Sequence, residues 1–480
     1  MKSNKASSAS CSVVILAAGQ GKRMRSTLPK VLVELAGVPL LFHILRRVRE
    51  AVPGAPVAIV VGHAREQVEN AVRSEAEFKD MSIEFVHQAE QLGTGHAVRC
   101  AMDAPWGKSI IRSKRTVLVL PGDLPLISTA LIDGMVEGGS MGSSTAVRLL
   151  TCSLPDPAGY GRVVRRGNEG GVLKIVEEKD ATPRQKSIKE VAASIYLFQS
   201  DFLAVMLRQL SAKNAQKEYY LTDLISMAVG KKKRVDVLQW SEHEDLRGVN
   251  DPWELALARQ FFNRRFLKKL AVTGVHITDP CTTWVDETVV VGEGTRIDPG
   301  TMLVGKTTIG KNVVIGPHCY LKDTVIEDSA VIKVGTVTEK AVVKSSASVG
   351  PYTHLRPDSV VGPECRIGNF VEIKKSKLGT KTNVSHLSYI GDAEIGSRVN
   401  IGCGFVTCNY DGQKKHQTVI EDEVFMGSDC QTVAPVRVGK GAYVASGSTI
   451  TDDVEPGALA IARSRQVTKP GYAGKLKGGN

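Results

Sequence analysis

A glycine-rich segment near the start of the chain has the composition of a phosphate-binding loop. Gly19 and Gly21 follow an apolar run, and the basic residues Arg23 and Lys30 come next. A glycine-rich turn between a strand and a helix directs backbone N–H groups at phosphate oxygens. Two nearby cations suit the charge that develops in phosphoryl transfer. Because the third glycine of a dinucleotide fingerprint is absent, a plain strand, turn and helix with solvated basic side chains remains the alternative.

A carboxylate follows a second apolar run. Asp123 comes after Thr116–Leu120, at the end of the segment Pro121-Gly122-Asp123. At the end of a buried strand, such a carboxylate lies in the ligand crevice of an α/β sheet, where a hard cation that bridges phosphates requires oxygen ligands. An isolated aspartate in this position is more often a turn residue, so the residue type alone leaves both interpretations open.

A histidine in the second half of the chain could act as a base. His386 lies in the polar stretch Asn383–Asp392, which interrupts an otherwise regular pattern. Attack of an amine on a thioester requires a group that removes a proton from the nitrogen, and histidine titrates in the suitable range. On residue type alone, a histidine in such a place is more often a surface residue.

The elements that must position these residues differ between the two halves of the chain. In the first half, short apolar runs alternate with amphipathic stretches. The expected strands are Val13–Ala17, Val57–Val61, Ile83–Val86, Thr116–Leu120 and Ser194–Phe198, and the expected helices include Pro39–Glu50 and Ala64–Val72. Apolar runs covered on both faces predict a mostly parallel, doubly wound (Rossmann-like) α/β sheet. Such a sheet binds ligands outside the carboxyl ends of its strands.

The stretch Asp251–Leu270 has the apolar spacing of one connecting helix. After it, aliphatic residues of the second half recur with a period of six. The aliphatic positions are Val291, Ile297, Leu303, Ile309, Ile315 and Leu321, then Val349, Leu355, Val361, Ile367 and Ile373, then Met426, Val438, Val444 and Ile450, with Thr432 as the exception. Glycine often follows the aliphatic residue, as at Gly292 and Gly310. Hexapeptide repeats indicate a parallel β-helix, with one aliphatic side chain per strand inside and a turn residue at each corner. A β-sandwich of short strands is the alternative.

Composition limits the classes of partner. The 480 residues are enough for two or three domains. The net charge is +12, but basic residues are scattered and aromatics make up only 5% of the chain, so we expect anionic small substrates and no nucleic acid. No apolar stretch approaches the ~20 residues of a membrane helix, so we expect no membrane partner. Nine cysteines without zinc spacing predict reduced thiols and a cytoplasmic location.

Three features together resemble one family of enzymes. They are the segment Leu16–Met24 followed by Pro29-Lys30, the segment Gln88–Ala97, and the hexapeptide repeats. From about Ser12 to Arg463, the chain resembles the bifunctional N-acetylglucosamine-1-phosphate uridyltransferase / glucosamine-1-phosphate N-acetyltransferase. The resemblance implies that acetyl-CoA acetylates glucosamine-1-phosphate. UTP then converts the product to UDP-N-acetylglucosamine and pyrophosphate, for cell-wall and lipopolysaccharide precursors.

The resemblance implies roles for residues of the first half. Arg23 supports the phosphates in the transition state, and Asp123 and Asn250 hold Mg2+. UTP and the sugar phosphate contact Leu16, Ala17, Ala18, Gly19, Lys30, Gln88, Gly93, Thr94, Gly161 and Glu177, and uracil is recognised by Gln88, Gly93 and Thr94. The chain departs from the family where Glu-x-Asn-Thr-Gly is usual, because the asparagine that contacts the sugar is Ala192 here. We hypothesise that this change weakens or redirects sugar recognition.

The resemblance implies a second set of roles in the second half. His386 is the catalytic base, and Glu372 orients its imidazole. Glucosamine-1-phosphate contacts Arg356, Lys374, Tyr389 and Asn400, and acetyl-CoA contacts Cys403, Asn409, Tyr410, Ser428, Ser446 and Arg463. The fold implied is a left-handed parallel β-helix that assembles as a homotrimer with active sites between subunits.

The expected domains follow from these assignments. They are a disordered leader (1–11), a uridyltransferase domain (12–250), a linker helix (251–272), a β-helix acetyltransferase domain (273–456) and a C-terminal tail (457–480). One rival is a sugar nucleotidyltransferase whose β-helix only serves oligomerisation or regulation, which would not need His386 or Arg356. The other is a non-catalytic carbohydrate- or nucleotide-binding scaffold, which would not need Arg23 or Asp123.

Overall fold

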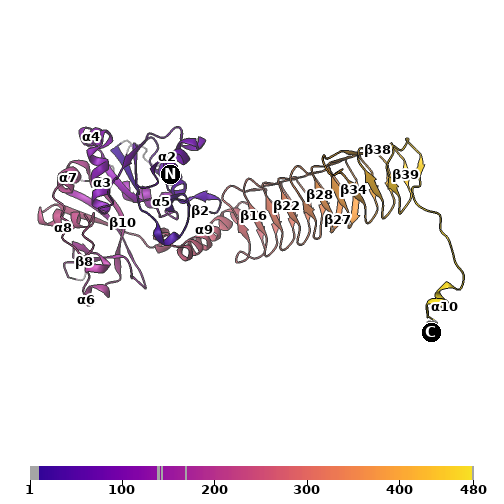
Figure 1. The fold of residues 1–480 in the computed structure, drawn as a ribbon. Helices are drawn as coiled ribbons and strands as arrows, with labels where there is room; N and C mark the ends of the chain where they lie inside the picture. Colours follow the sequence, from indigo (N-terminus) through magenta and orange to yellow (C-terminus); the bar gives the residue numbers. More distant parts are fainter. Residues whose placement is uncertain (1–9, 138–140, 142–143, 168–169, 478–480) are drawn as a thin grey trace. The chain divides into compact units, whose positions relative to one another are not determined.

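The computed structural model describes residues 10–137, 141, 144–167 and 170–477. The chain divides into two compact units, Met1–Phe262 and Asn263–Asn480 (Figure 1). Helix α9 (Pro252–Val272) crosses the boundary between them. Most of the expected leader lies outside the described residues, and its last residue, Cys11, already begins strand β1.

The first unit is built on a nine-stranded sheet with the central order β11-β7-β10-β6-β1-β4-β5 (Figure 1). Its strands are β1 (Cys11–Ala17), β4 (Val57–Val61), β5 (Ile83–His87), β6 (Thr116–Pro121), β7 (Thr145–Ser153), β8 (Gly161–Arg165), β9 (Val172–Val176), β10 (Glu190–Gln199) and β11 (Arg234–Gln239). The β6-β1-β4-β5 part is parallel, as expected. However, β10 runs antiparallel to β6 and β7, so the whole sheet is mixed. The chain reaches β10 through the antiparallel strands β8 and β9 and not through the long crossover that a parallel pair requires.

Helices cover both faces of this sheet. Consecutive side chains of a strand point to opposite faces, so Val13 and Ile15 belong to one hydrophobic cluster and Val14 to another. Residues of α1, α2 and α5 complete the first cluster, and residues of α3, α4, α7 and α8 complete the second. The helices are α1 (Leu40–Ala51), α2 (Arg65–Ser74), α3 (Thr94–Asp103), α4 (Pro105–Arg112), α5 (Thr129–Val136), α6 (Pro183–Lys186), α7 (Ser200–Leu207) and α8 (Asp223–Gly230).

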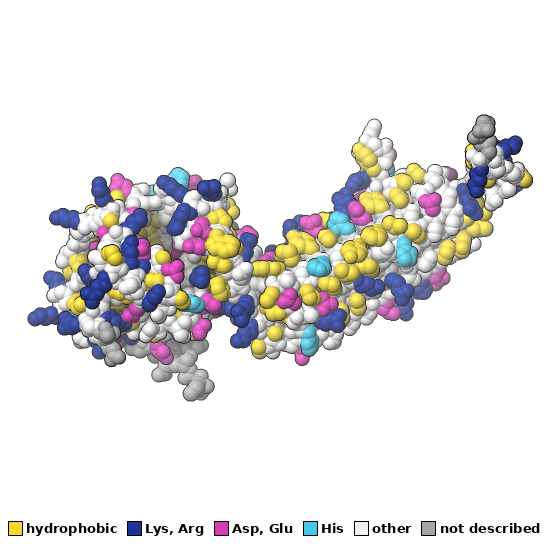
Figure 2. All heavy atoms as spheres, turned by 90° about the horizontal axis from the view of Figure 1, so that it is seen from below, with side chains coloured by type: hydrophobic (Ala, Val, Ile, Leu, Met, Phe, Trp, Pro, Cys, Tyr) yellow, Lys and Arg dark blue, Asp and Glu magenta, His cyan; other side chains and the backbone are white. Residues whose placement is uncertain are grey.

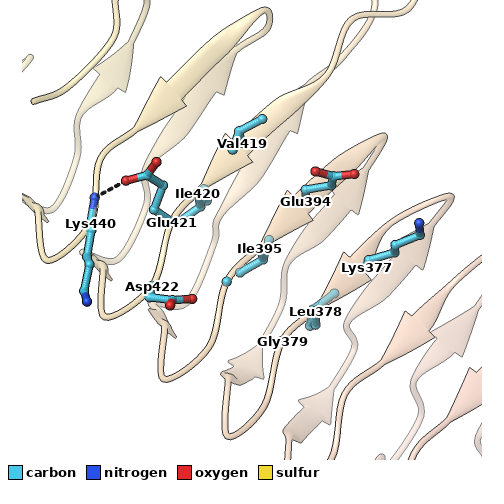
Figure 3. Close-up of a pocket in the computed structure, with 11 residues that line it drawn as sticks. Lys377, Leu378, Gly379, Glu394, Ile395, Val419, Ile420, Glu421, Asp422 and Lys440 are labelled. Carbon is cyan, nitrogen blue, oxygen red and sulfur yellow. Dashed lines mark hydrogen bonds between the residues drawn. The ribbon is translucent and has the colours of Figure 1, made fainter. Parts of the chain in front are cut away.

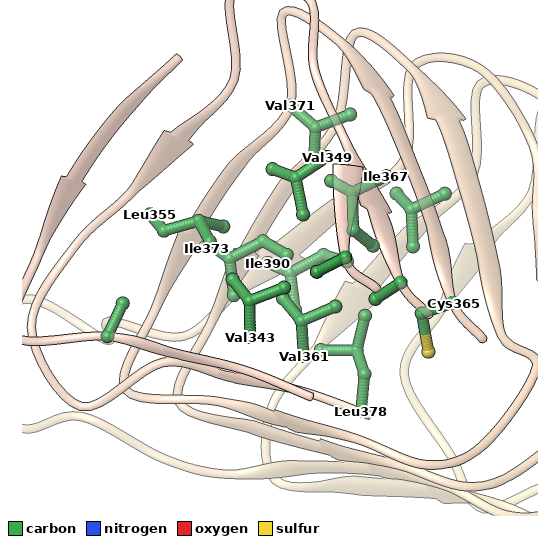
Figure 4. Close-up of a cluster of buried hydrophobic side chains, with 14 of the residues drawn as sticks. Val343, Val349, Leu355, Val361, Cys365, Ile367, Val371, Ile373, Leu378 and Ile390 are labelled. Carbon is green, nitrogen blue, oxygen red and sulfur yellow. The ribbon is translucent and has the colours of Figure 1, made fainter. Parts of the chain in front are cut away.

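The second unit is a parallel β-helix, as expected for the left-handed β-helix of hexapeptide repeats. Three sheets of 11, 10 and 9 short strands run from β12 (His276–Ile277) to β41 (Leu459–Ala460). One aliphatic side chain per strand points into the coil, and Leu355, Ile373 and Ile390 stack on one another there, fully buried. Figure 4 shows these three among the other interior side chains. The hexapeptide interpretation is therefore confirmed, and the β-sandwich alternative is wrong.

Threonine takes the place of an aliphatic side chain at a few interior positions. The hydroxyl of Thr432, the exception in the sequence pattern, lies 3.3 Å from the hydroxyl of Thr418. Thr338 in the same way donates to Thr324 at 2.9 Å. A buried hydroxyl without a partner costs free energy, so pairing of two threonines lets the β-helix interior accept them.

Glycines that follow the aliphatic residue of the repeat, such as Gly292 and Gly310, serve close packing and not the corners. Neither Gly292 nor Gly310 has a φ in the left-handed region, but a Cβ at Gly292 would lie 2.5 Å from the carbonyl oxygen of Gly310 in the next coil. The left-handed positions are held by other glycines, such as Gly294 (φ 76°), and by residues with side chains, such as Asn312 (φ 55°) and Asp323 (φ 49°). The expected turn residues therefore exist, but they stand at another position of the repeat.

The connecting helix α9 also closes the first coil of the β-helix. Its buried Asn263 donates to the carbonyl oxygen of Thr283 at 2.7 Å and accepts from the backbone N–H of Val285 at 3.1 Å. These two bonds satisfy backbone groups that have no preceding strand to pair with. Among the described helices, including α9 and the short α10 (Tyr472–Lys477), none has the length and apolar character needed to cross a membrane.

Hydrophobic side chains also lie on the surface of the β-helix. Met302, Tyr320 and Val337 are partly exposed and stand in register on successive coils of one sheet. Figure 2 shows hydrophobic side chains in rows along this unit. Contiguous apolar surface of this kind is typical of an interaction site.

Candidate active sites

A cavity of about 560 Å³ opens in the first unit where β1 and β6 end. Its walls include nearly all of the residues predicted for this half: Leu16, Ala18, Gly19, Arg23, Lys30, Gln88, Gly93, Thr94, Asp123, Gly161, Glu177 and Asn250. Ala17 lines a second hollow of about 320 Å³ that also borders Ala18 and Gly19. The structure thus brings together side chains from distant parts of the chain, at the edge of the sheet where α/β proteins bind ligands.

Lys30, Asp123 and Asn250 form a cluster in this cavity. The ammonium of Lys30 lies 2.5 Å from Oδ2 of Asp123 and 3.1 Å from Oδ1 of Asn250. The lysine side chain is 12% exposed and the aspartate side chain 22% exposed, so the pair is shielded from bulk water. Two oxygen donors from separate segments therefore converge on one cationic group, which is the arrangement that a metal or a phosphate-binding centre requires.

The glycine loop holds Lys30 in place. Gly21 has φ +60°, and a Cβ there would lie 2.6 Å from Cβ of Lys30. Only glycine suits both the left-handed backbone and the close approach. The loop continues into a single 3-10 turn, Lys22–Met24, where the sequence suggested a longer helix. The turn places the exposed Arg23 on the wall of the cavity.

Gln88 lies at another end of the cavity and is almost completely buried, at 4% exposed. Its amide nitrogen donates to the carbonyl oxygen of Gly93 at 3.2 Å and lies 3.1 Å from Nδ1 of His96. Gly93 itself has φ +101°, and a Cβ there would lie 2.9 Å from the carbonyl oxygen of Tyr219. These contacts fix the amide plane of Gln88. His96 was not predicted, although it stands in the recognised segment Gln88–Ala97.

Glu177 and Gly161 lie at the side of the cavity formed by β8 and β10. Burial raises the pKa of the Glu177 carboxyl, partly offset by Thr222, whose hydroxyl donates to it at 2.9 Å. Gly161 is in register with Ala192 on β10. The register of β10 shifts between Ala192 and Tyr196, and Ser194 in this bulge has φ +57°. The left-handed backbone at Ser194 explains why glycine suits this position in the family pattern.

In the second unit, His386 is exposed and bonded to an unexpected partner. Its Nδ1 lies 2.8 Å from Oδ1 of Asn369, and the two residues are in register on β27 (Arg366–Asn369) and β30 (Asn383–His386). Glu372, the partner expected from the resemblance, instead accepts from the guanidinium of Arg356 at 2.8 Å. The expected contact between Glu372 and His386 is therefore not made, because the ion pair holds the carboxylate on β28 (Glu372–Lys374).

Four of the residues predicted for acetyl-CoA, Cys403, Ser428, Ser446 and Arg463, lie along one corner of the β-helix, whereas Asn409 and Tyr410 do not. Backbone bonds connect the successive coils there: Leu387 N–H donates to Asn369 (3.0 Å), Gly404 to Leu387 (3.0 Å), Asp429 to Cys403 (2.6 Å) and Gly447 to Ser428 (2.9 Å). Arg463 lies beside Gly447, one coil further. The corner therefore carries Asn369, His386, Cys403, Ser428, Ser446 and Arg463 in a row.

A cationic cluster lies at the end of β28 and belongs to another corner. The ammonium of Lys415 and, more weakly, the guanidinium of Arg356 lower the pKa of Lys374. Three cations this close to one another suit a phosphate monoester. Lys415 was not predicted, because it stands in the polar insert after β34 (Val406–Cys408), where the period of six gives no positional signal.

The side chains of Tyr389 and Asn409 both lie against Gly391, near this cluster. A Cβ at Gly391 would lie 2.5 Å from the Tyr389 hydroxyl and 2.7 Å from Nδ2 of Asn409. Asn409 also donates to Asp392 at 2.7 Å, a buried carboxylate that was not predicted. Tyr410, next in the insert, is exposed, and its hydroxyl donates to the carbonyl oxygen of Gly412.

Asn400 is separated from the other residues predicted for glucosamine-1-phosphate. It belongs to β33 (Asn400–Ile401) and is in register with Asn383 and Phe425. Arg356, Lys374 and Tyr389 instead lie on or beside strands of a different sheet. One chain therefore does not gather this set on one face.

A further hollow of about 590 Å³ lies on the third sheet of the β-helix, and none of the predicted site residues lines it. Its charged wall residues include Lys377, Glu394 and Glu421 (Figure 3). Glu421 accepts from the backbone N–H of Lys440 at 2.6 Å, the bond drawn in Figure 3. The predicted site residues thus lie outside this hollow.

Comparison with known proteins agrees with the two units. Residues 13–153 match the family described as MobA-like NTP transferase domain, and residues 288–323 match bacterial transferase hexapeptide (six repeats). The chain is 46% identical to the bifunctional protein GlmU of Trichlorobacter lovleyi, over 97% of this chain and 98% of that protein. It is 43% identical to the protein of the same name from Geotalea uraniireducens (97% and 99% covered) and 44% identical to that from Pelobacter propionicus (97% and 98% covered).

Proposed function

Since the chain belongs to the family of the bifunctional protein GlmU, we propose that its two units carry out the two steps from glucosamine-1-phosphate to UDP-N-acetylglucosamine. The second unit transfers the acetyl group of acetyl-CoA to the amine, and the first unit transfers UMP from UTP to the product. The observation that carries the proposal is that each unit has a separate cluster of suitable chemistry: Lys30 with Asp123 and Asn250 in one, and His386 with Asn369 in the other.

In the first unit, an oxygen of the sugar-1-phosphate attacks the α-phosphate of UTP, and pyrophosphate leaves. Arg23 and Lys30 oppose the negative charge that grows on the phosphate oxygens. The amide nitrogen of Gln88 is bonded within the protein, so its carbonyl oxygen is oriented to accept from the N3–H of uracil. Gly161 leaves room for the sugar beside the Glu177 carboxylate, which accepts from sugar hydroxyls.

The donor set of the first unit also fits Mg2+. Asp123 and Asn250 offer one carboxylate and one amide oxygen to a common cation, and Mg2+ binds through one or two such ligands together with substrate phosphates. When bound, Mg2+ would neutralise phosphate charge. The ammonium of Lys30 contacts the same two oxygens and holds them together. It binds the substrate phosphates when these enter the site.

In the second unit, the amine of glucosamine-1-phosphate attacks the acetyl carbonyl of acetyl-CoA. His386 takes a proton from the nitrogen, the C–N bond forms, the C–S bond breaks, and the CoA thiolate leaves and takes up a proton. Arg356, Lys374 and Lys415 hold the phosphate by charge. Asn409 donates to the acetyl oxygen, and the corner row from Cys403 to Arg463 supports the CoA chain.

We propose that the active form is a homotrimer. Asn400 lies on a different sheet from Arg356 and Lys374, so a second copy must supply the missing side of the acetyltransferase site. The exposed apolar residues Met302, Tyr320 and Val337 would be covered by such an interface.

The remaining proposals concern domains and location. Residues 12–250 and 273–456 are the two catalytic domains, residues 251–272 link them, and residues 457–480 form a tail that begins with the last β-helix strand, β41 (Leu459–Ala460). All nine cysteines are free, which supports a reducing compartment. We therefore place the protein in the cytoplasm, where UTP and acetyl-CoA are made.

One experiment tests the whole proposal. The purified full chain is incubated with acetyl-CoA, UTP, Mg2+ and glucosamine-1-phosphate, and the sugar nucleotide is identified by mass. UDP-N-acetylglucosamine with stoichiometric free thiol and pyrophosphate is the expected result. Pyrophosphate release without thiol release would favour a nucleotidyltransferase with a purely structural β-helix. Neither release would favour a binding scaffold.

A further inference from the structure

The contact between Asn369 and His386 has the geometry of a positioning interaction. Oδ1 of Asn369 lies 2.8 Å from Nδ1 of His386, one coil away on the same corner. The imidazole is otherwise exposed, so this bond restrains a ring that solvent alone would leave free to rotate. The backbone supports the pair, because the N–H of Leu387 donates to the carbonyl oxygen of Asn369 at 3.0 Å.

No charged group among the described residues competes for this role. Glu372 is held by Arg356 at 2.8 Å. The other titratable side chains on the neighbouring strands are Arg366, Lys374 and Tyr389, with Cys403 at the corner of the next coil, and no hydrogen bond joins any of them to the imidazole in the described part of the chain. The partner of the ring is therefore a neutral amide.

A neutral amide oxygen has a specific effect on an imidazole. The neutral ring carries one N–H, and an acceptor at Nδ1 places that hydrogen on Nδ1. Nε2 then keeps its lone pair, which is the form that can accept a proton from an attacking amine. A carboxylate in the same place would also orient the ring, but its charge would favour the protonated form.

We propose that Asn369 is a positioning residue for acetyl transfer, which holds His386 in the tautomer and orientation of an active base. This inference rests on the proposed function of the second unit. It also assigns to Asn369 the orienting role expected of Glu372, and leaves Glu372 to hold Arg356 at the phosphate end.

The test is steady-state acetyl transfer by the full-chain variants Asn369→Ala and Asn369→Asp across pH. For Asn369→Ala, loss of the acceptor should lower kcat about 10- to 100-fold, with the KM of both substrates within about twofold. For Asn369→Asp, which keeps the acceptor and adds a charge, the rate at high pH should remain near that of the wild type. The acid limb of its kcat/KM profile should move up by about one pH unit.

Three controls separate the possible explanations. Asn312→Asp adds the same charge at an exposed corner of an early coil and should leave the profile unchanged. Uridyl transfer, measured on every variant, reports the integrity of the chain. His386→Ala tests the proposed function itself: if it retained acetyl transfer, that function would fail, whatever Asn369 does.

The inference on Asn369 has its own refutation. An Asn369→Ala enzyme with a kcat within twofold of the wild type would overturn it. If Asn369→Ala did not fold, the nearly isosteric Asn369→Asp would decide, and an unmoved acid limb would overturn the inference in the same way.

Discussion

Replacement of Ala192 by asparagine tests how the first unit recognises its sugar. Ala192 lines the cavity wall on β10, in register with Gly161 on β8, and neither side chain can hydrogen-bond a ligand. The carboxylate of Glu177, which lies beside Gly161, already accepts from Thr222 at 2.9 Å. The wall is therefore poor in side-chain donors at the place where the family pattern has an amide.

The expected gain follows from the value of one hydrogen bond. A bond between uncharged groups contributes about 0.5–1.5 kcal/mol net, and ~1.4 kcal/mol corresponds to a tenfold change in an equilibrium constant. Ala192→Asn should therefore lower the KM for N-acetylglucosamine-1-phosphate by about 2- to 12-fold. Ala192 is 3% exposed and packs in a hydrophobic cluster, so the added side chain must extend into the bordering cavity of about 560 Å³ to make this bond. Because the contact forms equally in the ground and transition states, kcat should change little.

The assay is pyrophosphate release with N-acetylglucosamine-1-phosphate, glucose-1-phosphate and ring-modified analogues. A matched control is Ser194→Asn, which adds the same amide in the bulge at a φ of +57° that asparagine tolerates. Identical specificity profiles for Ala192→Asn and the wild type would refute the reasoning. They would mean that a neighbouring residue or water already makes the contact.

Three further predictions address other residues. His386→Ala should lower acetyl transfer about 100- to 10,000-fold and spare uridyl transfer; loss of both activities in a folded protein would contradict two separate sites. Asp123→Ala should abolish uridyl transfer, with partial rescue by excess Mg2+, whereas pyrophosphate release at the wild-type rate would show that the metal ligand is misplaced. Burial raises the pKa of Glu177, so its contribution to stability falls as the pH rises through that pKa. Glu177→Gln should therefore have a higher melting temperature than the wild type at pH 8 and the same melting temperature in acid. A difference in melting temperature that grew in acid would argue against a buried carboxylate.

Much of the fold could be predicted because it depends on local burial. The fully buried run of β4 (Val57–Val61) is apolar in every residue, and the interior positions Leu355 and Ile373 recur at the period of the repeat. The direction of β10 could not be predicted in this way. A buried apolar strand looks the same in either direction, and the direction was decided by its pairing with β6 and β7.

The residues of the candidate sites also divide into those that the sequence predicts and those that depend on tertiary structure. Gly21, Lys30 and Asp123 belong to short motifs whose residue types already suit phosphate chemistry, so the sequence by itself determined them and the period of the β-helix. The partner of His386 depended on tertiary structure. Coils differ in length by one residue, since Leu303 stacks on Leu321 but Ile373 stacks on Ile390. That single residue decides whether Asn369 or a neighbour lies beside His386, because hydrogen bonds between coils follow the register and not the hydrophobic period.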